Sequence, residues 1–208
     1  MSLVTLDIPE PQQLRGGWAA MAAVCAARGW NDSAYAEKDQ WLYHDGGGNW
    51  ACLRFQHGGR AVMLGHDHEY SETYYGEAAE YFQEEETDLL AAAPDWWAAD
   101  LNPQPLGEWL GFVYGWDGLQ WQRAAYDLDD GFISVGLVDM CCDDSFDLLR
   151  QFASDAPGLN GEEPDDEALR QLVAADGNIT AALLGAVVPG WDIEAGVAAG
   201  RKFLLAKV

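Results

Sequence analysis

Apolar residues recur at helical spacing near the start of the chain. Leu14, Trp18, Met21 and Cys25 stand at i, i+4, i+7 and i+11, which is the spacing of one face of an α-helix. Gly29 is placed to end this helix, because glycine readily takes the left-handed conformation common at helix ends. The pattern predicts an amphipathic helix that covers a sheet, followed by a short helical segment over residues 31–35.

Three short apolar runs then follow, and glycine-rich turns separate them. The runs are residues 41–43, 50–55 and 60–64. The turns at residues 45–49 and 57–59 contain the residue types that tolerate positive φ. Strands joined by such short connections predict an antiparallel meander.

A second hairpin is predicted in the middle of the chain. Residues 109–114 and 119–126 are strand-like and flank the turn from Gly115 to Gly118. Residues 132–138 can extend the sheet. Before the hairpin, residues 74–82 have helical spacing, and residues 102–105 (Asn-Pro-Gln-Pro) form a linker-like break.

The last third of the chain has the spacing of several helices. Residues 146–153, the run after Pro164, residues 179–187 and the run that begins at Asp192 are predicted helices. The fold class is therefore predicted to be α+β, with a mostly antiparallel sheet of five or six strands. We expect one domain over residues 1–208 with a soft boundary near residue 142, and we expect the helical portion, residues 143–208, to pack on the same core.

The charge of the chain narrows the classes of partner. The 208 residues hold 11 Lys and Arg against 35 Asp and Glu, a formal net charge of −24. No Lys or Arg occurs between Ala61 and Gln122, although this segment contains 13 acidic residues. Such a surface repels phosphate backbones and anionic membranes, so we expect no nucleic-acid or membrane partner. It favours a basic protein partner, and the alternative is the general acidity of a salt-adapted or high-GC bacterial proteome.

Several features predict a cytoplasmic protein. No apolar run approaches the roughly 20 residues of a membrane span, and the N-terminus lacks the basic and apolar regions of a secretory signal peptide. The four cysteines form no C-x-x-C pair, which fits buried or free thiols in a reducing compartment. The sequence leaves the oligomeric state open.

All four histidines lie between residues 44 and 68, and two of them fall in one charged loop. His66, Asp67, His68 and Glu69 follow a predicted strand. In an extended stretch His66 and His68 point the same way and could meet one divalent metal, with Asp67 or Glu69 as a further ligand. This loop supports one alternative function, a small metal-dependent hydrolase. Its other interpretation is a polar loop whose side chains satisfy one another, with no cofactor.

The aromatic residues of the acidic segment support a different function. Tyrosine and tryptophan interleaved with acids are the residue types of a protein interface. The chain is therefore predicted to be a non-enzymatic interaction protein, of the kind that an immunity or inhibitor protein represents. A third alternative is a ligand- or carbohydrate-binding module built on exposed tryptophans. The candidate interface residues are Tyr74, Tyr75, Tyr81, Trp96, Trp97 and Trp116.

Overall fold

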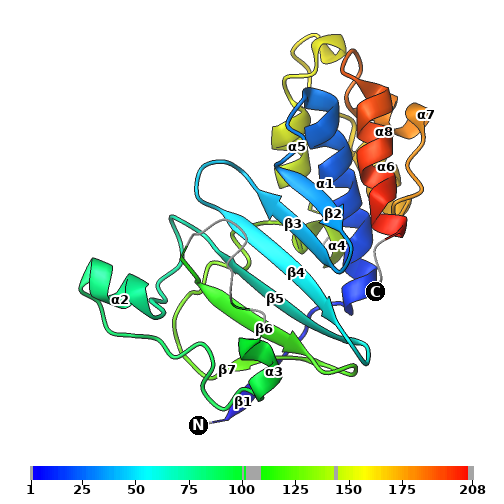
Figure 1. The fold of residues 1–208 in the computed structure, drawn as a ribbon. Coiled ribbons are helices and arrows are strands. Elements are labelled where there is room, and N and C mark those ends of the chain that lie inside the picture. The colour runs from blue at the N-terminus through cyan, green and yellow to red at the C-terminus, as the bar shows by residue number, and fades with distance from the viewer. Residues whose placement is uncertain (1, 100, 102–108, 143–144, 206–208) are drawn as a thin grey trace. The chain divides into compact units, whose positions relative to one another are not determined.

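The computed structural model describes residues 2–99, 101, 109–142 and 145–205. Over these residues the fold is α+β, with eight α-helices and one antiparallel sheet of seven strands in the order β1-β7-β6-β5-β4-β3-β2 (Figure 1). The predicted fold class is confirmed.

Most strands follow the predicted runs. Neighbouring strands along the chain pair through short turns, as β4 and β5 do from Trp50 opposite His66 to Gln56 opposite Arg60. The strands are β1 (Leu3–Leu6), β2 (Ala34–Glu37), β3 (Gln40–His44), β4 (Trp50–Gln56), β5 (Arg60–His66), β6 (Phe112–Trp116) and β7 (Trp121–Ala124).

The helices are short except for the first. Gly29 ends that helix with φ of 94°, as the sequence predicts. Asp192 accepts a hydrogen bond from the backbone N–H of Ala195 and so caps the last helix. The helices are α1 (Arg15–Arg28), α2 (Glu77–Phe82), α3 (Asp95–Ala98), α4 (Asp139–Cys142), α5 (Asp147–Ala153), α6 (Asp166–Ala174), α7 (Ala181–Val187) and α8 (Ile193–Arg201), with 3-10 turns at Pro11–Leu14, Pro157–Leu159 and Lys202–Leu204.

Backbone contacts divide the chain into two compact units. Among the described residues, unit 1 comprises those of the ranges 2–11 and 44–135. Unit 2 comprises residues 12–43 and 136–207. The N-terminal helix therefore belongs with the C-terminal helices, which local sequence patterns do not indicate. Packing of residues 143–208 on the core of the sheet stays a prediction.

The core of unit 1 lies on the strands β4, β5 and β6. Trp50 and Trp97 are its largest members, and α3 delivers Trp97 to it. Gly115 of β6 allows this packing, because a Cβ there would lie 2.1 Å from Cε2 and Nε1 of the Trp97 indole. The remaining buried members are Cys52, Val62, Leu64, Leu89, Leu101, Leu110 and Val113.

Unit 2 is built around α1. Every residue of this helix from Gly16 to Ala26 is buried, and the helix contacts α4, α5, α6, α8 and β2. Figure 1 shows α1 between α5 and α8. Gly196 of α8 allows a close approach, because a Cβ there would lie 2.5 Å from the backbone oxygen of Ala23. A helix that is apolar all round is a buried helix, so α1 is a central helix and the predicted amphipathic covering helix is wrong.

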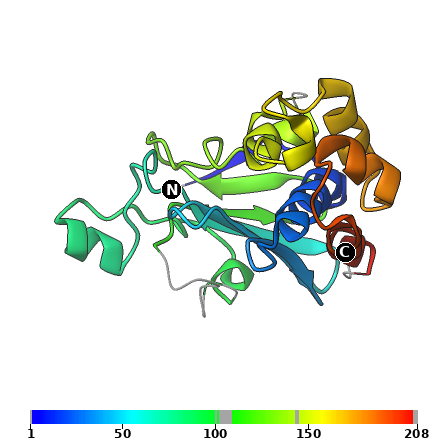
Figure 2. The same cartoon turned by 90° about the horizontal axis from the view of Figure 1, so that it is seen from above.

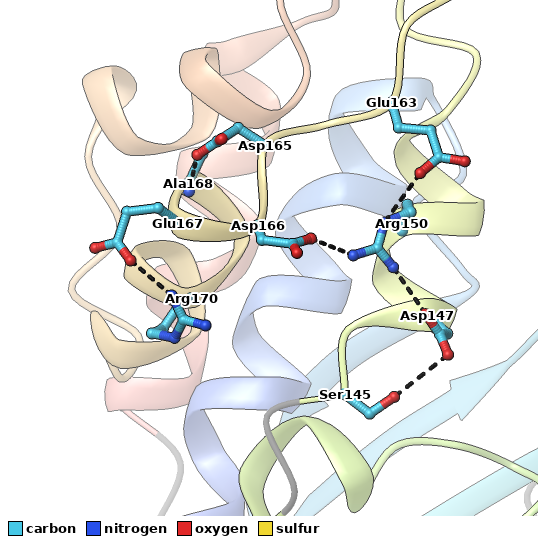
Figure 3. Close-up of polar contacts among 9 residues, drawn as sticks. All are labelled: Ser145, Asp147, Arg150, Glu163, Asp165, Asp166, Glu167, Ala168 and Arg170. Carbon is cyan, nitrogen blue, oxygen red and sulfur yellow. Dashed lines mark hydrogen bonds and ion pairs between the residues drawn. The ribbon is translucent and has the colours of Figure 1, made fainter.

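Several charged side chains of unit 2 form ion pairs. Arg150 of α5 lies among three carboxylates: Asp147 at 2.7 Å, Glu163 at 3.4 Å and Asp166 in close contact (Figure 3). Arg15, Arg28 and Arg170 of the same unit form further ion pairs, with Asp176, Asp155 and Glu167.

Three local predictions are wrong. The strand count of five or six misses β1 and β2, so the described residues hold seven strands. The predicted helical segment over residues 31–35 is a turn followed by β2, and the predicted strand over residues 132–138 is a series of turns. The break at residues 102–105 lies outside the described residues.

Candidate interaction surface

Residues 74–87 form a closed arm that carries α2. The backbone N–H of Thr87 donates to the oxygen of Tyr74 at 2.8 Å, which brings the two ends of the arm together. Inside this neck, the N–H of Gly76 donates to Oε1 of Glu86 at 3.2 Å. Figures 1 and 2 both show α2 projecting away from the strands of unit 1. Compact loops whose ends meet in this way are frequently functional.

Four aromatic rings gather on this arm and beside it. We call Tyr74, Tyr81, Phe82 and Trp109 the aromatic patch. The ring of Tyr81 lies 5.0 Å from that of Phe82 and 5.5 Å from that of Trp109, and Tyr74 lies 5.6 Å from Phe82. The exposed fractions of Tyr81 and Phe82 are 70% and 46%. The patch is thus an aromatic cluster on the protein surface.

A buried hydrogen bond holds together the two chain segments that form the patch. Oγ1 of Thr73, immediately before the arm, donates to the backbone oxygen of Gly111 at 2.5 Å. Gly111 follows Trp109 by two residues, so this bond brings Trp109 to the root of the arm. Nearby, Oγ of Ser71 donates to the backbone oxygen of Asp130 at 2.9 Å. Breaking a hydrogen bond between buried groups costs free energy, so these bonds hold the two segments of the patch in a fixed position.

The arm is strongly negative. Its sequence contains five glutamates and no Lys, Arg or His, a formal charge of −5. All five side chains are exposed, and none forms an ion pair with a described residue. The glutamates are Glu77, Glu80, Glu84, Glu85 and Glu86. The patch is therefore an apolar surface beside five glutamates whose charge no described residue compensates in an ion pair.

The structure brings only part of the predicted interface into this patch. Tyr74 and Tyr81 belong to it. Tyr75 is half-buried against the unit 1 core, and burial, with Asp88 and Glu86, raises the pKa of its phenol. Trp97 is 1% exposed, so this candidate interface residue lies in the core of unit 1.

Trp96 and Trp116 are half-buried and lie outside the patch. Trp96 packs against Trp97, and Trp116 packs against Trp121. Phe82 and Trp109 are the patch residues that the predicted interface missed. The sequence did contain a signal that Phe82 is exposed, because this residue ends a short helical run directly before Gln83 and three glutamates. Trp109 had none, because its place depends on the Thr73 to Gly111 bond.

The loop from His66 to Glu69 forms a backbone turn around Asp67. Oδ1 of the buried Asp67 accepts hydrogen bonds from the N–H groups of Glu69 and Tyr70, at 2.9 and 2.8 Å. The N–H of His68 donates to Oδ1 of Asn49 at 2.8 Å. A carboxylate that satisfies its own turn in this way is an Asx turn. The arrangement thus gives Asp67 a structural role.

The two imidazoles of this loop differ in environment. His68 is exposed, whereas Nδ1 of His66 is buried and finds no hydrogen-bond partner among the described residues. Burial lowers the pKa of His66 below its ordinary value, because a buried imidazolium loses its hydration. Across the described part of the chain, no three His, Cys, Asp or Glu side chains are grouped to hold a metal ion. A divalent metal at His66, Asp67, His68 and Glu69 stays a prediction, and zinc or manganese binding compared with a His66→Ala, His68→Ala variant is its test.

Several tryptophans belong to the core and cannot stack on a ligand. Trp41, Trp50 and Trp121 are fully buried, so their rings are not available to a ligand. A carbohydrate-binding role for any remaining tryptophan stays a prediction.

No protein-family model, curated protein or solved structure matches this chain. Within the described residues, none of the helices has the length and apolarity needed to cross a bilayer. The function of this protein is therefore inferred from its own residues.

Proposed function

We propose that this protein is a cytoplasmic, non-enzymatic binding protein whose aromatic patch docks a basic protein partner, as an immunity or inhibitor protein does. The observation that supports the proposal most strongly is the exposure of Tyr81 and Phe82 beside five exposed glutamates that form no ion pair with a described residue. Exposed aromatic clusters within polar rims are typical of interaction sites.

Aromatic side chains supply most of the binding energy that such a surface needs. Tyr and Trp are enriched among the residues whose truncation costs an interface about 2 kcal/mol or more. The glutamates act at longer range, because uncompensated negative charge speeds the encounter with a positive partner. The closed neck between Tyr74 and Thr87 reduces the ordering cost, because the arm is already folded before the partner arrives.

The test is affinity capture from the host cell with two variants of the protein. Tyr81→Ala, Phe82→Ala removes the exposed rings of the patch. Tyr70→Ala, Ile133→Ala removes two exposed apolar side chains outside the patch and is the matched control. We expect the wild type and the control to capture one basic protein that the patch variant does not capture. The same basic protein, once purified, should bind the purified wild type.

Two results would contradict the proposal. In the first, the purified partner binds the patch variant as tightly as the wild type, which would move the interface elsewhere. In the second, no purified protein distinguishes the patch variant from the control at all.

A further inference from the structure

Arginine side chains cover several partly exposed aromatic rings of this protein. The guanidinium carbon of Arg28 lies 3.8 Å from the ring centre of Trp30, and that of Arg123 lies 4.1 Å from Tyr126. Arg60 lies 5.3 Å from the Trp96 ring. An arginine over an aromatic face gains cation–π attraction while it shields the ring from water. This arrangement recurs in both units.

The aromatic patch lacks such a cover. Tyr81, the most exposed ring of the patch, carries no guanidinium from any described residue, nor does Phe82 or Trp109. The sequence explains this, because no Lys or Arg occurs from residue 61 to residue 122. Among the described residues, the patch thus has no counterpart of the arginines that cover Trp30, Trp96 and Tyr126.

We propose that the basic partner supplies this cation as an arginine side chain, which stacks on the patch at Tyr81 and Phe82. The inference rests on the proposed function and names the chemistry of that partner. Glu77 precedes Tyr81 by four residues on α2, so the two side chains are neighbours on one helix face. A guanidinium on the Tyr81 ring therefore has a carboxylate within reach of its N–H groups.

The arrangement of the rings favours arginine over a compact ammonium group. Tyr81 and Phe82 meet edge to face at 85°, and Tyr81 and Trp109 are inclined by 33°. Tyr81 is 70% exposed, so a flat group can stack on its ring. A planar guanidinium can stack on an outward ring face and still donate to a carboxylate, whereas the more strongly hydrated lysine ammonium gains less from the ring.

The experiment uses two synthetic peptides that differ only in the cation. One alternates glycine with four arginines, and the other alternates glycine with four lysines; both have blocked ends. Binding to the full chain is measured by isothermal titration calorimetry at low salt. We expect the arginine peptide to bind about two- to fivefold more tightly, as cation–π contact at an exposed site implies. Tyr81→Leu, Phe82→Leu should abolish this preference and leave the weaker charge-driven binding, while Glu77→Gln should weaken the binding of both peptides.

Equal affinity for the two peptides, an unchanged preference in the leucine variant, or no binding of the arginine peptide would each overturn the inference. These results are separable from failure of the proposed function. If a purified partner depends on the patch but the peptides show no arginine preference, only the arginine inference fails. If no partner depends on the patch, the proposed function fails whatever the peptides show.

Discussion

The phenol oxygen of Tyr114 lies 2.6 Å from Oδ2 of Asp130, and both residues are buried. The hydroxyl of Tyr126 donates to the same oxygen at 2.7 Å, and the N–H of Phe132 donates to Oδ1 at 3.1 Å. Burial, together with the Asp130 carboxylate, raises the pKa of both phenols, so they remain hydrogen-bond donors at neutral pH. A buried carboxylate held in this way fixes the loop that follows β7.

Removal of one of the two tyrosine hydroxyls should therefore destabilise unit 1. Tyr114→Phe leaves Oδ2 of Asp130 with one hydrogen-bond donor in place of two. Loss of a hydrogen bond to a buried carboxylate lowers the free energy of unfolding by about 1–3 kcal/mol. Urea denaturation followed by tryptophan fluorescence measures this loss. Tyr70→Phe, at an exposed site, is the control and should stay within about 0.5 kcal/mol of the wild type. Equal effects of the two substitutions would show that the Asp130 bonds contribute nothing to stability.

Thr73 is a positioning residue for the aromatic patch. Thr73→Val keeps the shape of the side chain but removes the 2.5 Å bond to Gly111, and we expect a loss of about 1–2 kcal/mol in stability. Because the same bond brings Trp109 to the arm, partner affinity should fall as well. Thr73→Ser restores the hydroxyl and should recover most of both properties. The prediction fails if serine and valine at this position behave alike in denaturation and in calorimetric titration with the partner.

Gly115 should not tolerate a side chain. A Cβ there would lie 2.1 Å from the buried indole of Trp97, so Gly115→Ala must displace that ring or bend β6. Overpacking of this kind costs roughly 1–3 kcal/mol. Gly185 of α7 is the control, since a Cβ there meets nothing within 4 Å and alanine in a helix is favoured over glycine by up to about 1 kcal/mol. Thermal unfolding should show opposite shifts, and a stable Gly115→Ala variant would contradict the packing of Trp97.

Burial of His66 should make stability depend on pH. Its pKa is lowered in the fold, so below the ordinary value of about 6.5 the unfolded chain takes up a proton that the folded chain resists. Stability contributed by neutral His66 is therefore present near pH 7 and is lost as the pH falls toward 5. His66→Gln should reduce this loss, whereas His57→Gln, in an exposed turn, should leave it unchanged. Urea denaturation at pH 7 and pH 5 measures the difference, and equal losses in all three proteins would contradict it.

The glutamates of the arm should act on association more than on stability. Glu84→Gln, Glu85→Gln removes two exposed charges next to the patch, and we expect the association rate with the basic partner to fall by about two- to tenfold at low salt. The difference should shrink at high salt, because salt screens exposed charges. Stopped-flow measurements at two salt concentrations test this. Glu162→Gln, Glu194→Gln is a control of equal charge in unit 2, and an equal slowing by the control would show that only net charge matters.

Local signals in the sequence predicted those helices and hairpins whose ends are set by residues adjacent in the chain. Gly29 ends α1 and Asp192 caps α8, since both effects involve only adjacent residues. Strand β1 escaped prediction because its four residues pair with β7, where Leu3 lies opposite Ala124. A four-residue strand whose partner is more than a hundred positions away has no local pattern that identifies it. The burial of α1 on all sides was likewise set by helices from the other end of the chain.

The sequence by itself determined the charge of the arm and the residue types of the candidate surface. It could not determine which aromatic residues face solvent. Trp97 and Tyr81 both lie in short helices beside acidic residues, yet Trp97 is buried and Tyr81 is 70% exposed. Only the tertiary structure separates them: Gly115 provides room for the Trp97 indole, while α2, the helix that contains Tyr81, projects away from the strands of unit 1 (Figure 1). Exposure depends on what lies opposite a side chain in space, and that neighbour is distant in sequence.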